Sequence, residues 1–210
     1  MKVLAHRGYW NEIIKKNTSK ALRTALYYGY GFESDVRDYC GRMVISHDIA
    51  DSSCQDAEEV FKWLNEFEDR YTFAINIKAD GLKHFLHKYL TNYKISNYFL
   101  FDMTTPQMIE FREMGLRFFS RQSEVEPQPL MYDEAAGIWI DGFWSVDWIT
   151  EDLLSKHLNN GKQICLVSPD LHGNIDYQKF WRRLKEYKID FSRVMICTDY
   201  PDEARAFFDE

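Results

Sequence analysis

Short apolar runs alternate along the chain with longer segments in which apolar residues recur at helical spacing. The first apolar run, Val3-Leu4-Ala5, ends on His6-Arg7-Gly8, and a helix-like stretch follows over residues 19–28. This order of strand, polar tip and helix recurs to the end of the chain. Further strands are expected at residues 32–36, 43–47, 72–77, 98–101, 117–120, 137–140, 163–167 and 194–197. Further helices are expected at residues 56–70, 82–93, 105–114, 150–158, 177–187 and 202–208, with a weak helix near Met131.

The alternation predicts an α/β protein built as a (β/α)8 TIM barrel. We count about eight strand-helix units, and their strands are continuously apolar, as buried parallel strands are. An open, doubly wound sheet fits the same alternation less well. No Gly-x-Gly-x-x-Gly follows the first strand, so nucleotide binding lacks support. The length suits one domain, which we expect to span residues 1–210. In such barrels the polar strand ends gather at one mouth, where active sites lie.

Two carboxylates mark the second strand. Glu33 and Asp35 are two residues apart, so the strand period points both to the same side. Like charges repel, and the usual reasons to keep such a pair are a divalent cation or an acid/base couple with separated pKa values. The next apolar run ends on His47-Asp48, which brings an imidazole close to the pair. The alternative is a polar strand edge with a hairpin and a chance histidine.

The strand ends together supply a set of groups suited to phosphodiester cleavage. His6 and His47 can act as general base and general acid. Arg7 and Lys78 suit a phosphate group, and the two carboxylates suit a hard cation that neutralises a phosphoryl oxygen. Lys78 could instead form a Schiff base, which we consider the weaker interpretation.

Composition narrows the class of protein. The formal net charge is −7 and no basic stripe is present, so we expect a small-molecule substrate and no nucleic acid. The four cysteines show no C-x-x-C spacing and are expected to be reduced thiols. No apolar stretch is long enough to form a transmembrane segment, and no signal peptide precedes His6, so we expect a cytoplasmic protein.

Several of these motifs together resemble the glycerophosphodiester phosphodiesterase family. The motifs are His6-Arg7-Gly8, Asn17-Thr18, Glu33-Ser34-Asp35-Val36, His47-Asp48, Lys78 and Thr198-Asp199-Tyr200-Pro201, in the family's order and at similar spacing. The resemblance runs from residue 3 to about residue 204. Any one of the motifs alone would be a weak signal, whereas the combination is specific.

The resemblance implies a metal-dependent hydrolase of lipid metabolism, on a TIM barrel, that releases glycerol 3-phosphate and an alcohol from glycerophosphodiesters. It implies that His6 and His47 form the acid/base pair and that Arg7 and Lys78 hold the phosphate. It further implies Mg²⁺ or Ca²⁺ as cofactor, bound by Glu33 and Asp35. In that family a neighbouring hydroxyl of the substrate attacks first, giving a cyclic phosphate that water then opens.

The chain departs from the family pattern in three places. The third metal ligand, a glutamate two residues before the lysine, is replaced by Asn76, and the acidic residue before Asn17-Thr18 is replaced by Lys16. The insertion that follows His47-Asp48 in the family is short. An amide oxygen can still bind a metal, but the site loses one negative charge.

Other polar residues after the expected strands could supply what is missing. They are Asp102, Glu124, Asp141, Ser168 and His172, and Glu124 or Asp141 could lend the absent carboxylate. The alternative for each is a helix cap or a loop hydrogen bond. Trp139, Trp144 and Trp148 bracket Asp141 and either line a substrate pocket or belong to the core.

Two alternatives for the function stay open. The same chemistry could act on another phosphodiester, such as a lysophospholipid or a glycerol-phosphate polymer. The second alternative is a catalytically silent barrel that binds phosphorylated ligands. It is considered because Asn76 and Lys16 depart from the family pattern. Two imidazoles at a phosphate site favour an enzyme over a pure binder.

Overall fold

The computed structural model describes residues 1–209, and the chain divides into two compact units. The N-terminal unit is Ala5–Phe118, and the C-terminal unit is Phe119–Glu210 together with Met1–Leu4. The first strand, β1 (Lys2–His6), is therefore shared by both units. The N-terminal unit continues with α1 (Ser19–Tyr27), β2 (Gly31–Tyr39), β3 (Arg42–Ile45), α2 (Glu58–Glu66), β4 (Phe73–Ile77), α3 (Lys83–Asn92), β5 (Tyr98–Phe101) and α4 (Thr105–Glu113). The C-terminal unit contains β6 (Phe119–Gln122), β7 (Gly137–Ile140), α5 (Glu151–Asn159), β8 (Gln163–Val167), η1 (Pro169–His172), α6 (Tyr177–Glu186), η2 (Phe191–Arg193), β9 (Val194–Thr198) and α7 (Pro201–Asp209).

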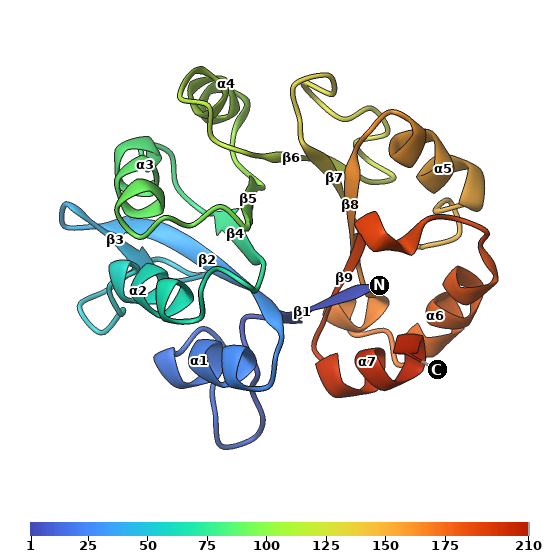
Figure 1. The fold of residues 1–210 in the computed structure, drawn as a ribbon, viewed down its shortest axis with the longest axis horizontal. Coiled ribbons are helices and arrows are strands. Elements are labelled where there is room, and N and C mark those ends of the chain that lie inside the picture. Colours follow the sequence, from blue (N-terminus) through green and yellow to red (C-terminus); the bar gives the residue numbers. More distant parts are fainter. Residues whose placement is uncertain (210) are drawn as a thin grey trace. The chain divides into compact units, whose positions relative to one another are not determined.

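The N-terminal unit is a sheet in the order β5-β4-β2-β1, with successive helices packed side by side along it (Figure 1). Strands β2, β4 and β5 are parallel, as expected for buried apolar strands. Aromatic rings fill the space between sheet and helices. The Phe73 ring centroid lies 4.9 Å from that of Phe32 and 5.7 Å from that of Phe61 on α2. This packing fixes β2, the strand that carries the two carboxylates.

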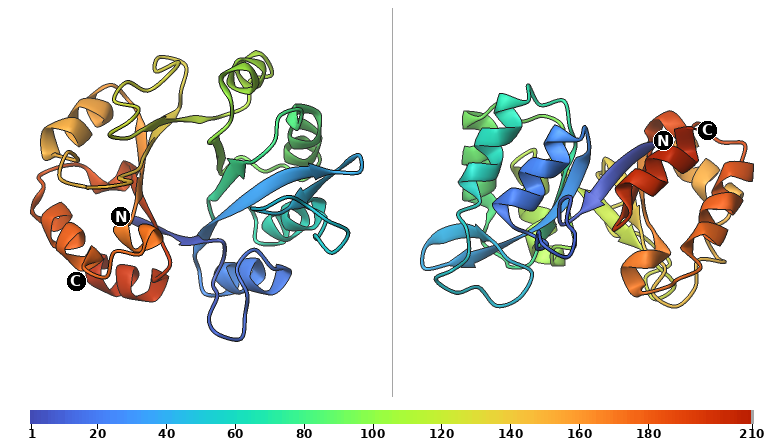
Figure 2. Two further views of the ribbon diagram at one scale, coloured as in Figure 1. Left: turned by 180° about the vertical axis from the view of Figure 1, so that it is seen from behind. Right: turned by 90° about the horizontal axis from the view of Figure 1, so that it is seen from below.

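The C-terminal unit is a second set of parallel strands in the order β9-β8-β7-β6. Helices α5, α6 and α7 pack against one side of these strands (Figure 2). The core between them includes Ile138, Ile164, Ile196 and the fully buried Trp181 of α6. The Trp181 indole N–H donates to the hydroxyl of Ser168 at 2.8 Å. Ser168 therefore has a structural partner and anchors the loop after β8.

Threonine hydroxyls cap three of the helices. Thr18, Thr104 and Thr150 have extended backbones and accept hydrogen bonds from the N–H groups three residues later. These bonds satisfy N–H groups that have no partner within the helix. The caps explain why α1, α4 and α5 begin where the sequence pattern placed them.

The prediction that every strand is parallel is wrong for β3. This strand pairs antiparallel with β2, and Tyr39 faces Arg42 across a two-residue turn. Cys40 and Gly41 both have positive φ, 46° and 75°. Two positive φ values are typical of the tight turn that matches strand twist in a hairpin. The second apolar run is thus an antiparallel extension of β2, and it carries His47 at its end.

The prediction of a weak helix near Met131 is also wrong. The segment between β6 and β7 forms turns, and Met131 has a φ of 48°. Pro127 and Pro129 remove backbone donors and restrict the residues before them, which disfavours a helix here. Within residues 1–209 the structure therefore has seven α-helices, and β6 connects to β7 without one.

The remaining expected strands and helices are present, with ends that differ by a few residues. Strand β6 continues through Arg121 to Gln122, which were expected to lie beyond its end. Within residues 1–209, no helix combines the length and the apolar character that crossing a membrane requires. The expectation of a single domain over residues 1–210 stays a prediction.

Candidate functional site

The turn after β1 positions the first two candidate residues. His6 ends the strand, Arg7 has a φ of 56°, and Gly8 has a φ of 87°. A Cβ on Gly8 would lie 2.6 Å from the backbone carbonyl carbon of Ala21 in α1, so only glycine fits this approach. The bend directs the Arg7 backbone N–H to Oε2 of Glu33 at 3.1 Å. The glycine therefore allows the turn to place Arg7 against β2.

Glu33, Asp35 and Asn76 lie on one face of the sheet. Asp35 and Asn76 are directly opposite in the parallel pairing of β2 with β4, and Glu33 is two residues before Asp35. All three side chains are buried, with exposures of 2%, 0% and 8%. The structure thus brings the three predicted metal ligands onto neighbouring strands.

Asp35 is the centre of the charged contacts in this unit. Its Oδ2 lies 3.2 Å from Arg7 Nε, and its Oδ1 lies 3.5 Å from Lys78 Nζ. A buried carboxylate is costly unless cations and hydrogen bonds surround it, and both predicted phosphate-binding residues do so here. The predicted cations and carboxylates are therefore one cluster.

Asn17 is a residue of this cluster that sequence reasoning missed, because it was seen only as part of a motif that opens a helix. Its amide Nδ2 donates to Asp35 Oδ2 at 2.7 Å, and its Oδ1 accepts from the Ser34 hydroxyl at 2.8 Å. Its backbone N–H donates to the Arg7 carbonyl at 2.9 Å. Asn17 thus fixes Asp35 and Arg7 relative to each other.

Arg37 is a second residue that sequence reasoning missed. Its Nη2 donates to the backbone carbonyl of Lys78 at 2.9 Å, which ties the end of β4 to β2. Arg37 is two residues after Asp35, so the strand period could have placed it on the same face.

The electrostatics of the cluster raise the pKa of Glu33. Burial raises the pKa of the Glu33 carboxyl well above its usual value, and the negative charge of Asp35 raises it further. The charges of Arg7 and Lys78 and the hydrogen bond from the Arg7 N–H act in the opposite direction. Glu33 and Asp35 are therefore a carboxylate pair in which one member resists ionisation.

The two candidate imidazoles approach the cluster from different strands. His6 Nε2 lies 3.9 Å from Glu33 Oε2. His47 follows β3, and the N–H of the preceding residue, Ser46, donates to the Asp35 carbonyl at 3.1 Å. The His47 Nδ1 lies 2.9 Å from Asp48 Oδ1, and this hydrogen bond lowers the pKa of the Asp48 carboxyl. A carboxylate beside the ring orients an imidazole for proton transfer.

The donor set fits a hard divalent cation. The side-chain oxygens Asp35 Oδ1 and Asn76 Oδ1 are buried and accept no hydrogen bond. Buried acceptors without donors are uncommon, and carboxylate and amide oxygens are ligands of Mg²⁺ and Ca²⁺. Over residues 1–209 there is no group of three or more His, Cys, Asp or Glu side chains that could hold a metal. The third candidate ligand is the amide of Asn76, which does not belong to these four residue types, so the candidate site agrees with that result.

Comparisons with known proteins were made at the levels of sequence and fold. No family model matches the chain, and no curated protein matches its sequence. A glycerophosphodiester phosphodiesterase from Parabacteroides distasonis matches in structure with a TM-score of 0.75 at 17% identity, covering 99% of this chain and 96% of that one. A glycerophosphoryl diester phosphodiesterase from the same organism matches with a TM-score of 0.72 at 12% identity, covering 99% and 86%.

The chain has the (β/α)8 barrel fold. The TIM barrel prediction is thus confirmed, and the resemblance to the glycerophosphodiester phosphodiesterase family is confirmed at the level of the fold. At these identities the likeness does not extend to individual residues. The candidate residues therefore depend on the geometry of the N-terminal unit.

The other polar residues singled out in the sequence have contacts of their own. Asp102 follows β5 in the N-terminal unit and has a φ of 62°. In the C-terminal unit, Glu124 accepts N–H groups from Phe143, Trp144 and Ser145 at 2.8 to 3.1 Å. Glu124 therefore anchors the loop after β7, which is the alternative that the sequence left open.

Asp141 and His172 form a pair in the C-terminal unit. The His172 Nε2 lies 2.6 Å from Asp141 Oδ1, and this bond raises the pKa of the imidazole. Asp141 follows β7 and His172 ends η1, so two strand ends supply the pair. An imidazole held by a carboxylate can donate a proton or bind an oxygen of a ligand through its other nitrogen.

Proposed function

We propose that the chain is a metal-dependent phosphodiester hydrolase that cleaves glycerophosphodiesters to glycerol 3-phosphate and an alcohol. The observation that carries this proposal is the buried cluster around Asp35, in which two cations and two carboxylates meet on neighbouring strand ends. Such a cluster has the positive groups that an anionic phosphate needs and the oxygens that a cation needs. The fold likeness to two glycerophosphodiester phosphodiesterases supports the same reaction class.

Each residue has a role in the proposed reaction. Arg7 and Lys78 hold the phosphate group, and Asn17 and Arg37 hold those two residues in place. Glu33, Asp35 and Asn76 would hold Mg²⁺ or Ca²⁺, and the cation would neutralise charge on a phosphoryl oxygen. The substrate enters as a small anion.

Proton transfer is assigned to the two histidines. In the first step, one of His6 and His47 takes the proton of the substrate hydroxyl that attacks phosphorus, and the other gives a proton to the leaving alcohol oxygen. The cyclic phosphate that forms is then opened by water, with the two histidines exchanging roles, and this second step gives glycerol 3-phosphate. The partner of His47 for orientation is Asp48, at 2.9 Å. Asp102, Glu124, Asp141 and His172 stay candidates for substrate contacts or for supporting roles.

The substrate and the cellular setting are part of the proposal. We infer a small-molecule phosphodiester and no nucleic acid from the net charge of −7. The four cysteines form no disulfide within residues 1–209, which supports a reducing compartment such as the cytoplasm. The proposed substrates themselves suggest a role in lipid metabolism. Asn76 leaves room for a catalytically silent barrel that binds phosphorylated ligands, and the same experiment separates the two.

The test is release of glycerol 3-phosphate from a panel of glycerophosphodiesters, with Mg²⁺, Mn²⁺ or Ca²⁺ added and with a chelator. We expect metal-dependent turnover that falls by at least about a hundredfold in His6→Ala and in His47→Ala, because each variant loses a proton-transfer group. His87→Ala is the matched control, since His87 is exposed on α3. The panel also includes a lysophospholipid and a glycerol-phosphate polymer. Their rates of cleavage rank the possible alcohol leaving groups.

The outcomes separate the alternatives. Turnover that persists in either variant removes that histidine from the mechanism. Turnover unchanged by chelator removes the metal. If no substrate is cleaved while glycerol 3-phosphate still binds, the silent barrel replaces the enzyme.

A further inference from the structure

The large apolar side chains that are exposed on the C-terminal unit share one position in the fold. Within residues 119–209 they all lie in segments that follow the carboxyl end of a strand. They are Val125 and Leu130 after β6, Trp144 after β7, Ile175 after β8 and Tyr200 after β9. Because β6 to β9 are parallel, these segments leave the sheet at the same edge. We call Val125, Trp144, Ile175 and Tyr200 the apolar rim.

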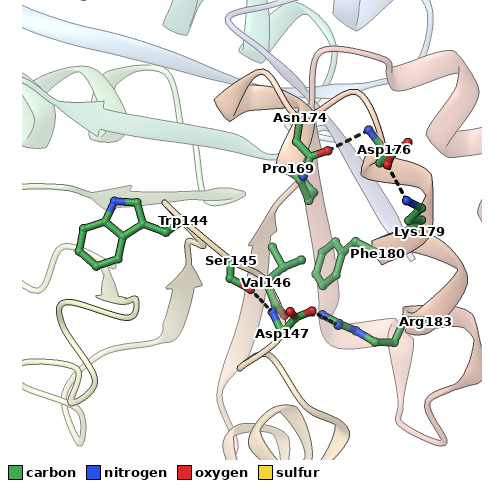
Figure 3. A pocket seen from close by; sticks show the side chains of 10 residues that line it. All are labelled: Trp144, Ser145, Val146, Asp147, Pro169, Asn174, Asp176, Lys179, Phe180 and Arg183. Carbon is green, nitrogen blue, oxygen red and sulfur yellow. Dashed lines mark hydrogen bonds and ion pairs between the residues drawn. The ribbon is translucent and has the colours of Figure 1, made fainter.

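Two members of the apolar rim are almost fully in water. Trp144 is 79% exposed and Ile175 is 90% exposed. Single exposed apolar residues are normal on a protein surface, whereas side chains on successive loops at one edge of a sheet can all reach the same external surface. Figure 3 shows the Trp144 ring lying apart from the neighbouring Val146 and Phe180 side chains. The ring is therefore available to an external partner.

A pocket of about 280 Å³ is lined by the segments that follow β7 and β8 and by α6. Its apolar part is formed by Val146, Pro169 and Phe180, and two ion pairs border it (Figure 3). Arg183 Nη1 lies 2.9 Å from Asp147, and Lys179 Nζ lies 2.5 Å from Asp176. Ion pairs with exposed acidic partners are weak, so the Lys179 ammonium can exchange Asp176 for an external phosphate. Arg183 also donates to the Val146 carbonyl, which keeps its positive charge at this edge. The edge thus offers apolar side chains beside one exchangeable and one fixed cation.

We propose that the apolar rim docks this edge onto a zwitterionic lipid surface, with Trp144 and Ile175 inserting among the headgroups. Tryptophan is favoured at the boundary between lipid and water, and a lysine or arginine nearby can meet the lipid phosphate. The net charge of −7 disfavours a strongly anionic membrane, which is why the lipid is zwitterionic.

A lipid surface fits these residues better than a protein partner. Polar residues such as Ser145, Asn174 and Asp176 separate the members of the apolar rim, so they form no continuous apolar patch. The centre of a protein interface needs such a patch, whereas lipid accepts side chains from separate loops one at a time. The choice of substrate rests on the proposed function. If this edge docks onto lipid, the substrates are amphiphilic phosphodiesters such as lysophospholipids.

The test is sedimentation of the full chain with large unilamellar vesicles of phosphatidylcholine. Trp144→Ser and Ile175→Ser should each weaken vesicle binding about tenfold or more, and the double variant about a hundredfold, because each loses one buried side chain. Trp144→Phe should keep most of the affinity. Tyr27→Ser is the matched control, since Tyr27 is also a large exposed side chain, at 68%, but lies at the end of α1.

The vesicle lipid is an intact diacyl phospholipid, so binding is read without turnover. His47→Ala should bind vesicles as well as the unchanged chain, and a failure of glycerophosphodiester cleavage leaves the docking result intact. Absence of vesicle binding by the unchanged chain overturns the inference, as does binding that the double variant retains. Binding that requires an anionic lipid and disappears with salt also overturns it. So does a dimer that the double variant converts to a monomer, since a second copy would then cover the rim.

Discussion

At the scale of the residue, Asp35 organises the candidate site. It is fully buried, and it is tolerated because Arg7, Lys78 and Asn17 each present a donor or a positive charge to its carboxylate. Removing one partner leaves a buried charge uncompensated, which costs more than the pair itself contributes. The cluster is thus interdependent.

The position of Asn76 allows a direct test of the metal. Asn76→Glu places a carboxylate opposite Asp35, restoring the negative charge that the family pattern has at this position. We expect Mg²⁺ or Ca²⁺ to bind roughly tenfold more tightly or better, because cation affinity rises with the charge of the ligands. Isothermal titration calorimetry of the purified chain measures the change.

The matched control for this variant is Asn76→Gln, which keeps a neutral amide at a longer reach. It should not tighten binding. An Asn76→Glu chain that folds and titrates like the unchanged chain would place residue 76 away from the ion, and the site would then hold its cation with Glu33 and Asp35 alone.

At the scale of the element, a buried polar network takes the place of the missing helix after β6. His157 of α5 is buried, with Nε2 at 2.8 Å from Gln122 Oε1 and Nδ1 at 2.9 Å from the Tyr132 hydroxyl. Lys162 donates to the carbonyls of Asp133 and Ala135 at 3.1 and 2.8 Å. The two Lys162 bonds satisfy backbone carbonyls that would be paired within a helix if one formed here. The network therefore holds the irregular segment against α5 and β8.

This network predicts a pH-dependent stability. Burial, aided by the charges of Lys156 and Lys162, lowers the pKa of His157 to about 4. The unfolded chain therefore binds a proton on this group at a higher pH than the folded chain does. The stabilisation is complete above the ordinary histidine pKa of about 6.5 and is lost as the pH falls toward 4, amounting to at most about 3 kcal/mol. Urea unfolding measured at several pH values gives the slope.

His157→Gln serves as the comparison, because glutamine keeps a hydrogen-bonding side chain but does not titrate. The free energy of unfolding of this variant should fall less between pH 6.5 and 4 than that of the unchanged chain. Carboxyl groups such as Glu33 contribute equally to both proteins and cancel in the difference. Parallel slopes would mean that His157 takes up its proton at the same pH in the folded and the unfolded chain.

At the scale of the whole molecule, sequence periodicity predicted the order of the elements but not every connection. The buried strands were found because parallel strands are continuously apolar, a local signal. The antiparallel β3 corresponds to the hairpin that the sequence left open as an alternative, because an apolar run does not show the direction of a strand. The helix expected near Met131 gave too little weight to Pro127 and Pro129. Asn17 and Arg37 were missed because their partners lie far away in the sequence, at Asp35 and Lys78.

The four thiols provide a test of the fold as a whole. Cys165 and Cys197 are buried in β8 and β9, whereas Cys40 is exposed at the hairpin turn and Cys54 is half-buried in a loop. In the native chain we expect Ellman's reagent to modify two thiols readily. The other two should react at least about a thousandfold more slowly, because they are reached only when the core opens. Adding urea should release Cys165 and Cys197 together, since both belong to one unit.

The variant Cys40→Ser with Cys54→Ser should then show no rapid reaction at all. Rapid reaction of a third thiol would mean that β8 or β9 is not buried as described. If fewer than two thiols react before reduction and two react afterwards, Cys40 and Cys54 form a disulfide. That result would contradict the reducing compartment that we propose. Because the reagent reads burial directly, the result is independent of any substrate, metal or lipid.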